Sequence, residues 1–332
     1  MGGISAFRTA RDTSEHCDSK PKIAMKCLVR IWAAILFFLV TAGRIVQGQS
    51  FTWVELRDLA VHRLTGVSAN GGVVVGVARD EQGRSKAFRW TVWEGVQELG
   101  TLGGLRSQAL AVSGDGRVVV GMAESGYGYA RAFRWSVEGG MEDLGTLGGS
   151  ESEALAVSAD GRVVVGMAED ASGRFRAFRW TAEGGMEDLG TLGGKWSQAL
   201  AVSADGRVVV GMAEDARGRR RAFRWTAEGG MEDLGTLGGW DSKAVWVSED
   251  GTVIVGVAQD KEGIWHTFHW QKGKMRRLSK VYDGLLSHGS MFWGAPVVSY
   301  NGRYVAGTGY NASHNRVEIF LLDAAGLLMA MN

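Results

Sequence analysis

The chain has 332 residues, of which 45% are hydrophobic, and a formal net charge of +1. This near balance of charge excludes a protein that binds nucleic acid through a strongly basic surface. Both cysteines, Cys17 and Cys27, lie within the first 48 residues, so the remainder can form no disulfide, thiol nucleophile or cysteine metal site.

The first 48 residues differ from the rest of the chain. Lys26 and Arg30 precede the apolar run IWAAILFFLVTA at 31–42, and VQG at 46–48 offers a cleavage site. A run of about 12 apolar residues is too short to span a bilayer and is typical of a secretory signal peptide. We therefore expect a signal peptide at 25–48 and a translation start at Met25, with residues 1–24 as a wrongly assigned upstream extension.

The product predicted from this leader is secreted, periplasmic or extracellular, with no membrane span after cleavage. Residues 1–48 hold seven Lys/Arg and three Asp/Glu, so the remaining chain, 49–332, has a net charge of −3.

A 45-residue repeat fills the rest of the chain. Successive copies place a tryptophan at the same position, and the stretch 156–194 returns almost unchanged at 201–239. These tryptophans are Trp90, Trp135, Trp180, Trp225 and Trp270. A degenerate sixth unit follows, in which VVSYNGRYVAGTG begins at Val297. A period of this length indicates stacked or ringed copies of one unit, none of which buries its apolar surface alone.

Within a unit the apolar residues alternate with a period of two, which predicts strands rather than helices. In the third unit we expect strands at 155–158, 163–168, 177–181 and 186–190, with turns at 159–161, 169–175 and 183–185. Residues 191–197 would form a further turn that leads to the next unit. Because VVVGMA is apolar on both faces, its strand needs cover on both, which neighbouring sheets in a ring supply.

Four antiparallel strands that recur every 40 to 50 residues are typical of a β-propeller blade. The six units therefore predict an all-β, six-bladed β-propeller of four-stranded antiparallel blades, built as one domain at 49–332. The segment FTWVELRDL at 51–59 would pair into the last blade, whose own outer strand is weak, and close the ring. The alternative architecture is an open β-solenoid or stack of repeats.

The motifs AFRW, GGMEDLGTLGG, SQALAVS and DGRVVVG recur in fixed order, and in them the chain resembles the HAF family of extracellular repeat proteins. The family is named for a His-Ala-Phe tripeptide, and the resemblance covers almost everything from Val54 onward. Here the tripeptide begins with Lys86 in the first unit, with arginine in the next three and with His266 in the fifth. We expect a solvated cation at this position and not a catalytic histidine. The resemblance implies a secreted repeat protein with no established activity.

Other polar residues suggest no catalytic or metal centre. His266 and His269 are three apart on a predicted strand, so their side chains should point to opposite faces. Asp160 and Asp205 supply one carboxylate per turn, whereas a calcium loop needs several, so we expect them to form turn hydrogen bonds. We predict no catalytic residue, no metal and no cofactor.

The copies differ mainly in two segments. The loop after the second strand reads ESGYGYA, EDASGRF, EDARGRR and QDKEGIW in units two to five, and the residues after LGG read LRSQ, SESE, KWSQ and WDSK. In an up-and-down blade both segments emerge on one face, opposite the nearly constant ADGR and EGG turns. Exposed aromatics beside cations suit sugars or extended peptides. The candidate ligand-binding residues are Trp196, Trp240, Trp265 and Tyr129 for stacking, with Lys195, Arg219 and Arg220 as anion contacts.

We predict a non-catalytic, monomeric module for binding or surface interaction, whose partner is an extracellular polysaccharide or protein. Two alternatives stay open. A propeller enzyme acting on extracellular polysaccharide would need an acid/base pair on the variable face, for which the loop carboxylates Glu124, Glu169 and Glu214 are the candidates. A purely structural component of the cell envelope would bind nothing through that face.

Overall fold

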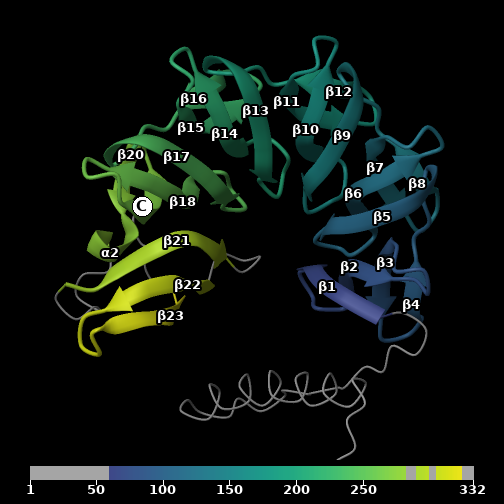
Figure 1. Cartoon of the computed structure of the whole chain (residues 1–332), viewed down its shortest axis with the longest axis horizontal. Coiled ribbons are helices and arrows are strands. Elements are labelled where there is room, and N and C mark those ends of the chain that lie inside the picture. Colours follow the sequence, from purple (N-terminus) through teal and green to yellow (C-terminus); the bar gives the residue numbers. More distant parts are fainter. Residues whose placement is uncertain (1–59, 282–288, 299–303, 324–332) are drawn as a thin grey trace, which may run out of the picture. The chain divides into compact units, whose positions relative to one another are not determined.

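The computed structural model describes residues 60–281, 289–298 and 304–323, which all belong to a single unit of the chain. Within these ranges the strands form six antiparallel sheets, which we call blades 1 to 6. In every blade the strand order follows the chain order, and the first strands of neighbouring blades contact one another around a common axis (Figure 1). The described part is therefore a β-propeller of six antiparallel sheets, as predicted, rather than an open stack. Blades 1 to 5 have four strands each, and the described part of blade 6 has three.

The strands have the following bounds. Blade 1 consists of β1 (Ala60–Val67), β2 (Val73–Arg79), β3 (Ser85–Thr91) and β4 (Gly95–Glu98). Blade 2 consists of β5 (Gly103–Val112), β6 (Val118–Ser125), β7 (Ala130–Ser136) and β8 (Gly140–Asp143). Blade 3 consists of β9 (Gly148–Val157), β10 (Val164–Asp170), β11 (Phe175–Thr181) and β12 (Gly185–Asp188).

Blade 4 consists of β13 (Gly193–Val202), β14 (Val209–Asp215), β15 (Arg220–Thr226) and β16 (Gly230–Asp233). Blade 5 consists of β17 (Gly238–Val247), β18 (Val253–Asp260), β19 (Trp265–Gln271) and β20 (Lys274–Arg277), and the short helix α2 (Leu278–Val281) follows it. The described part of blade 6 consists of β21 (Met291–Val298), β22 (Tyr304–Asn311) and β23 (Arg316–Asp323).

Three of the sequence predictions lie outside the described residues: the upstream extension 1–24, the signal peptide 25–48 and the ring-closing segment 51–59. They stay predictions. In the part of the chain that the structure describes, no helix has both the length and the apolar character needed to cross a bilayer.

The first strand of each blade begins earlier than predicted. We expected a turn at 191–197, but β13 already starts at Gly193. Gly193 has a φ of +99°, and a Cβ on Gly194 would overlap the Glu214 side chain, so both positions require glycine. In the sequence a Gly-Gly pair indicates a turn. Here it lets a strand run close against the hairpin of its own blade.

The hydrophobic core lies between neighbouring blades. In blade 3, Val164 packs in the cluster shared with blade 2, whereas Val165 packs in the cluster shared with blade 4. Phe178 is fully buried beside Gly166, its partner in register, where a Cβ would overlap the carbonyl oxygen of Glu153. Each such side chain contributes about 1.5–3 kcal/mol by burial. The predicted cover on both faces of the VVVGMA strand is confirmed.

A buried serine joins each of blades 2 to 5 to the blade before it. In blade 4, Ser197 Oγ accepts a hydrogen bond from the Ala177 amide at 2.8 Å and donates one to the Gly190 carbonyl oxygen at 2.6 Å. The equivalent serines accept the same bond from the preceding blade in each case. The hydroxyl satisfies a donor and an acceptor that burial would otherwise leave without partners.

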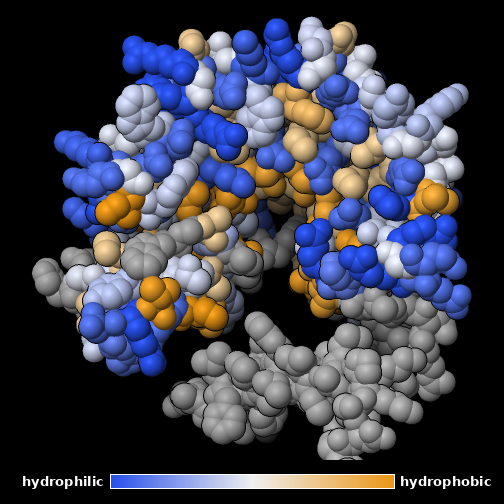
Figure 2. Space-filling model, in the orientation of Figure 1, coloured by the Kyte–Doolittle hydropathy of each residue, from blue (hydrophilic) through white to orange (hydrophobic). Residues whose placement is uncertain are grey.

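A cavity of about 640 Å³ lies where the first strands of the blades meet, and residues from all six blades line it. Its lining is mostly apolar, with Val112, Val157 and Val202 at equivalent positions of their strands. Figure 2 shows apolar side chains, in orange, around the opening at the centre of the blades. The first strands thus line a mostly apolar cavity at the axis.

Candidate ligand-binding site

The two variable segments lie on the same face, as predicted. Within blade 4 the amide of Lys195, at the start of the first strand, donates a hydrogen bond to Glu214 Oε2, next to the hairpin after the second strand, at 3.2 Å. Between blades 4 and 5 the amide of Arg220 donates one to Asp241 Oδ1 at 3.0 Å. Each hairpin therefore contacts the start of its own first strand and of the first strand in the next blade.

The constant turns lie at the other ends of these strands. Ser158 Oγ donates to Asp160 Oδ1 at 2.6 Å, and the same oxygen accepts the Arg162 amide at 3.1 Å. The Ala159 amide donates to the Ala204 carbonyl oxygen of the next blade at 3.1 Å. The prediction that Asp160 serves turn hydrogen bonding is confirmed, and the sequence of this face is restrained by these contacts.

Six of the seven candidate residues lie on blades 4 and 5. Lys195 and Trp196 stand near the start of β13, Arg219 and Arg220 at the junction of the hairpin and β15, Trp240 near the start of β17, and Trp265 at the start of β19. We call Lys195, Trp196, Arg220, Trp240 and Trp265 the blade 4/5 rim. Several of these residues, predicted to be in loops, lie within the bounds of strands. Arg220 and Trp265 pair in register with the second strand of their blades. The other rim residues lie where the register of the first strand shifts.

Arg220 and Trp196 form a cation–π pair at the centre of the rim. The guanidinium carbon of Arg220 lies 5.8 Å from the centroid of the Trp196 ring. Trp196 is half-buried and Arg220 is exposed, a setting in which such a pair contributes about 0.5–1 kcal/mol. Because the Arg220 amide is also bound to Asp241, the pair is fixed to both blades.

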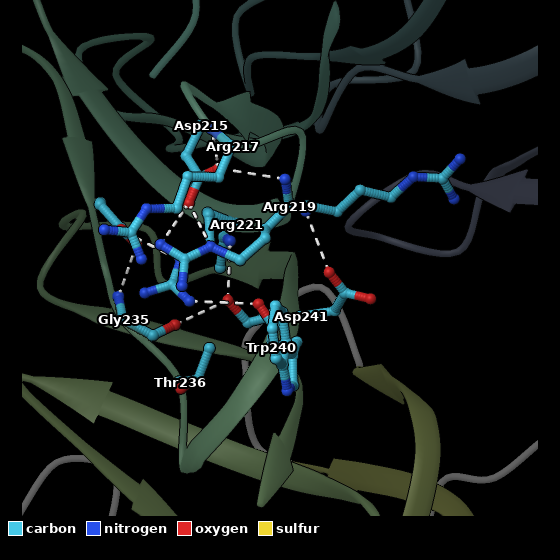
Figure 3. A network of polar contacts seen from close by, with 12 residues as sticks. Asp215, Arg217, Arg219, Arg221, Gly235, Thr236, Trp240 and Asp241 are labelled. Atoms are coloured by element: carbon cyan, nitrogen blue, oxygen red, sulfur yellow. Dashed lines mark hydrogen bonds and ion pairs between the residues drawn. The ribbon is translucent and has the colours of Figure 1, made fainter. Parts of the chain in front are cut away.

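Trp240 projects from a fixed backbone. Its carbonyl oxygen accepts a hydrogen bond from Arg221 Nη1 at 3.1 Å (Figure 3). Arg221 Nε in turn lies 3.1 Å from Asp233 Oδ2. Trp240 is nevertheless 69% exposed. An indole held in this way can stack on a ligand without losing much conformational freedom.

Arg219 and Tyr129 do not join this arrangement. Arg219 Nη2 lies 2.6 Å from Asp215 Oδ2, so a carboxylate already balances its charge. Burial raises the pKa of Asp215, but the hydrogen bonds from Arg219 outweigh it and leave the pKa below its usual value. Tyr129 is 48% exposed and precedes the third strand of blade 2. Of the predicted cations, Lys195 and Arg220 have no ion pair with a carboxylate in the described ranges.

The cation at the first position of the tripeptide is not solvated, contrary to our prediction. In the first four units it forms an ion pair and keeps only 13–22% of its side chain exposed. The third strand lies inside the sheet, so its long side chains reach carboxylates on the neighbouring strands. The residues are Lys86, Arg131, Arg176 and Arg221.

In blade 5, His266 takes this position and is almost fully buried. Its Nε2 lies 2.7 Å from Asp260 Oδ2, and Arg277 Nη2 donates to the same oxygen at 2.8 Å. Burial raises the pKa of Asp260, but these contacts and the Ile264 amide outweigh it and lower the pKa to about 2. Within the described residues, no group of three or more His, Cys, Asp or Glu is placed to hold a metal ion.

Two of the three carboxylates considered for the enzyme alternative bind main-chain amides. Glu169 Oε2 accepts the amides of Ser150 and Glu151 at 2.7 and 3.3 Å, and Glu214 makes the equivalent contact with Lys195. These contacts fix the early start of the first strand. They give Glu169 and Glu214 a structural role that does not require catalysis.

Sequence reasoning missed the polar ring at the axis. The first strands carry one polar residue each at an equivalent position: Arg63, Gln108, Glu153, Gln198 and Lys243. Burial raises the pKa of Glu153, and the charge of Arg63 on blade 1 partly opposes this. In the sequence, these residues could have been found as a polar position that recurs within the first strand of each unit.

One residue that lines the central cavity differs in size between the units. Trp246 lines the central cavity where the preceding units have Gly66, Ala111, Ala156 and Ala201. A large aromatic that replaces small residues in a single repeat was visible in the sequence.

No family model matches the chain, and no curated protein matches it in sequence. Among solved structures it is similar to TolB from Acinetobacter baumannii, with 15% identity, a TM-score of 0.50 and coverage of 78% of this chain and 63% of that one. Oligogalacturonate lyase from Vibrio parahaemolyticus shows 10% identity, a TM-score of 0.52 and coverage of 79% and 78%. Puromycin hydrolase shows 18% identity, a TM-score of 0.51 and coverage of 80% and 46%.

At this level of identity these likenesses show the fold alone. The chain spans less than two thirds of the A. baumannii TolB chain and less than half of puromycin hydrolase. Fold and comparisons together define a β-propeller module built from repeats.

Proposed function

We propose that this β-propeller is a non-catalytic binding module that acts as a monomer and holds an extracellular polysaccharide at the blade 4/5 rim. The observation that carries the proposal is Trp240, 69% exposed on a strand that Arg221 fixes, next to the Arg220–Trp196 pair. Large exposed aromatics on a rigid frame mark interaction sites.

A polysaccharide suits this rim better than a flat protein surface. Indole faces stack on the apolar faces of sugar rings, while Arg220 and Lys195 can donate hydrogen bonds to hydroxyl or carboxylate groups between them. The predicted signal peptide and the resemblance to HAF repeats support a secreted or periplasmic location, where such polymers occur. The HAF assignment itself stays a proposal.

The test is retention of the purified protein, expressed from the full-length coding sequence, on a panel of neutral and acidic polysaccharides, with the polymers then checked for shortening. We expect retention without cleavage. Trp240→Ala should weaken binding about tenfold or more, because truncating a central aromatic typically costs about 2 kcal/mol. Arg220→Ala should weaken it less.

Trp93→Ala is the matched control. Trp93 is 92% exposed but lies in the hairpin between β3 and β4 of blade 1, away from the rim. Equal losses for Trp93→Ala and Trp240→Ala would mean that any exposed indole adsorbs to the polymer, and the rim would lose its support. Shortened polysaccharide would establish an enzyme instead, and no retention on any polymer would overturn the proposed ligand class.

A further inference from the structure

The outer edge of blade 5 reverses the charge found in the blades before it. The fourth strands β8, β12 and β16 read Gly-Met-Glu-Asp, whereas β20 reads Lys-Met-Arg-Arg. The turn before β20 adds Lys272 and helix α2 adds Lys280, so residues 272–280 hold five basic side chains and no acidic one. So dense a set of like charges attracts an anion.

Four side chains of this edge lie on one face of the β19–β20 hairpin. His269 pairs in register with Arg276, and Gln271 pairs with Lys274. Because residues two apart on a strand point to the same face, the four side chains are neighbours. With Lys272 they line a hollow of about 190 Å³, to which no acidic side chain of the described ranges contributes.

His269 replaces an arginine that has a structural task in other blades. Arg134 Nε donates to the Gly161 carbonyl oxygen at 3.2 Å, and Arg179 Nε donates to that of Gly206 at 3.4 Å, each in the constant turn of the next blade. The imidazole of His269 is shorter than the arginine side chain that it replaces. The substitution leaves a hollow beside the basic strand.

The ring of His269 is 2% exposed, and its Nε2 has no hydrogen-bond partner within the described part of the chain. Burial lowers the pKa of His269 and the charge of Arg276 lowers it further, so the ring is neutral at neutral pH. In the tautomer that carries its proton on Nε2, this nitrogen is a buried donor that lacks an acceptor. Buried polar groups without partners are rare, and a ligand is one explanation for them.

Two cations of the hollow, Lys274 and Arg276, are also available. Arg277 is bound to Asp260, but neither Lys274 nor Arg276 forms an ion pair with a carboxylate in the described ranges. Both side chains are exposed. Arg276 can bind two oxygens of one anion with its planar fork, while Lys274 acts as a point charge.

We propose that this hollow, the blade 5 anion pocket, binds a phosphate or sulfate group between Arg276, Lys274 and the Nε2–H of His269. Its volume admits one oxyanion and a few waters, since a water molecule occupies about 30 Å³ in the liquid. Arg276 also lines an adjoining hollow of about 430 Å³, where Leu237, Met275 and Val281 provide apolar surface for the uncharged remainder of a larger ligand.

The test is titration of the full chain with inorganic phosphate and inorganic sulfate, followed by calorimetry and by the ¹⁵N shift of His269 Nε2. We expect saturable binding with a Kd on the order of millimolar or tighter. Arg276→Glu should weaken it at least tenfold. This substitution places glutamate where the fourth strands of blades 2 to 4 already carry it, so the fold should tolerate it.

Arg162→Glu is the control, because it changes the net charge equally on an exposed turn of blade 3. It should leave the affinity within about twofold. Equal weakening by both variants, no saturable binding of either anion, or an unchanged His269 shift would overturn the pocket. Co-sedimentation with phosphatidylglycerol vesicles that Arg276→Glu abolishes would add a lipid headgroup as the source. Saturable phosphate binding without co-sedimentation would assign a soluble phosphorylated or sulfated ligand.

Discussion

Blades 4 and 5 have the same strand order, the same register and the same kind of core, but different chemistry. Both bury a phenylalanine, Phe223 or Phe268, beside a glycine of the second strand, and both use a serine hydroxyl to bind the preceding blade. The outer strand is acidic in blade 4 and basic in blade 5. A few positions therefore fix the frame, while the others are free to acquire ligand contacts.

The shared frame is most directly broken at the glycine beside the buried phenylalanine. A Cβ on Gly211 or Gly256 would overlap a main-chain carbonyl oxygen of the first strand, so Gly211→Ala and Gly256→Ala should each abolish folded protein, as measured by circular dichroism. Gly218→Ala is the control: its φ is +74° but nothing lies within 4 Å, so a cost of about 1 kcal/mol is expected. Tolerance of either frame substitution would contradict the close approach.

The two blades should differ at the aspartate that ends the second strand. In blade 5, Asp260 is held by His266 and Arg277 and keeps 5% of its side chain exposed, whereas Asp215 in blade 4 pairs with Arg219 alone and keeps 13%. Asp260→Asn should therefore lower the Tm more than Asp215→Asn, since it removes the carboxylate charge that buried His266 and Arg277 both contact. Equal shifts in calorimetry would show that the extra partners add nothing.

The same aspartate predicts a pH dependence. The pKa of Asp260 is about 2, below the ordinary 3.8 of an aspartate, so its ionised form contributes stability that is present above about pH 4 and is lost as the pH falls towards 2. The Tm difference between the wild type and Asp260→Asn should shrink over this range. A difference that is constant from pH 5 to pH 2 would contradict the ion pairing.

The smallest difference between the two blades is expected at the buried serine, which makes the same contacts in both. Ser197→Ala and Ser242→Ala each remove the acceptor of a buried amide, Ala177 or Ala222, and should destabilise by about 1–3 kcal/mol. Because the two sites have the same geometry, chemical denaturation should give equal values within about 0.5 kcal/mol. A larger difference would show that the two interfaces are not equivalent.

The repeat made the architecture predictable, because a strict period places every tryptophan, serine and glycine in the same environment. The bounds of the first strand were not predictable from local signals: the glycines at 193 and 194 read as a turn, yet they allow strand pairing close to Glu214. Local turn chemistry could not reveal that the hairpin beside them supplies a hydrogen-bond acceptor.

The rim residues were found because they vary between units, but their mutual contacts were not. The Arg220–Trp196 pair and the Arg220–Asp241 bond join residues from separate strands, and only the register brings them together. Pairing also removed Arg219 from the set of available cations, which the sequence could not show. The charge reversal on β20 was present in the sequence and became informative once His269 was seen to be buried beside it.

The measurement that tests this account most directly is a crossed comparison on one preparation of the full chain, with polysaccharide retention and phosphate titration measured for Trp240→Ala and Arg276→Glu. If blades 4 and 5 carry two separate ligand sites on one frame, Trp240→Ala loses polysaccharide and keeps phosphate, and Arg276→Glu does the reverse. Loss of both ligands in both variants, with the fold intact, would contradict the claim that the variable positions of the two blades act independently.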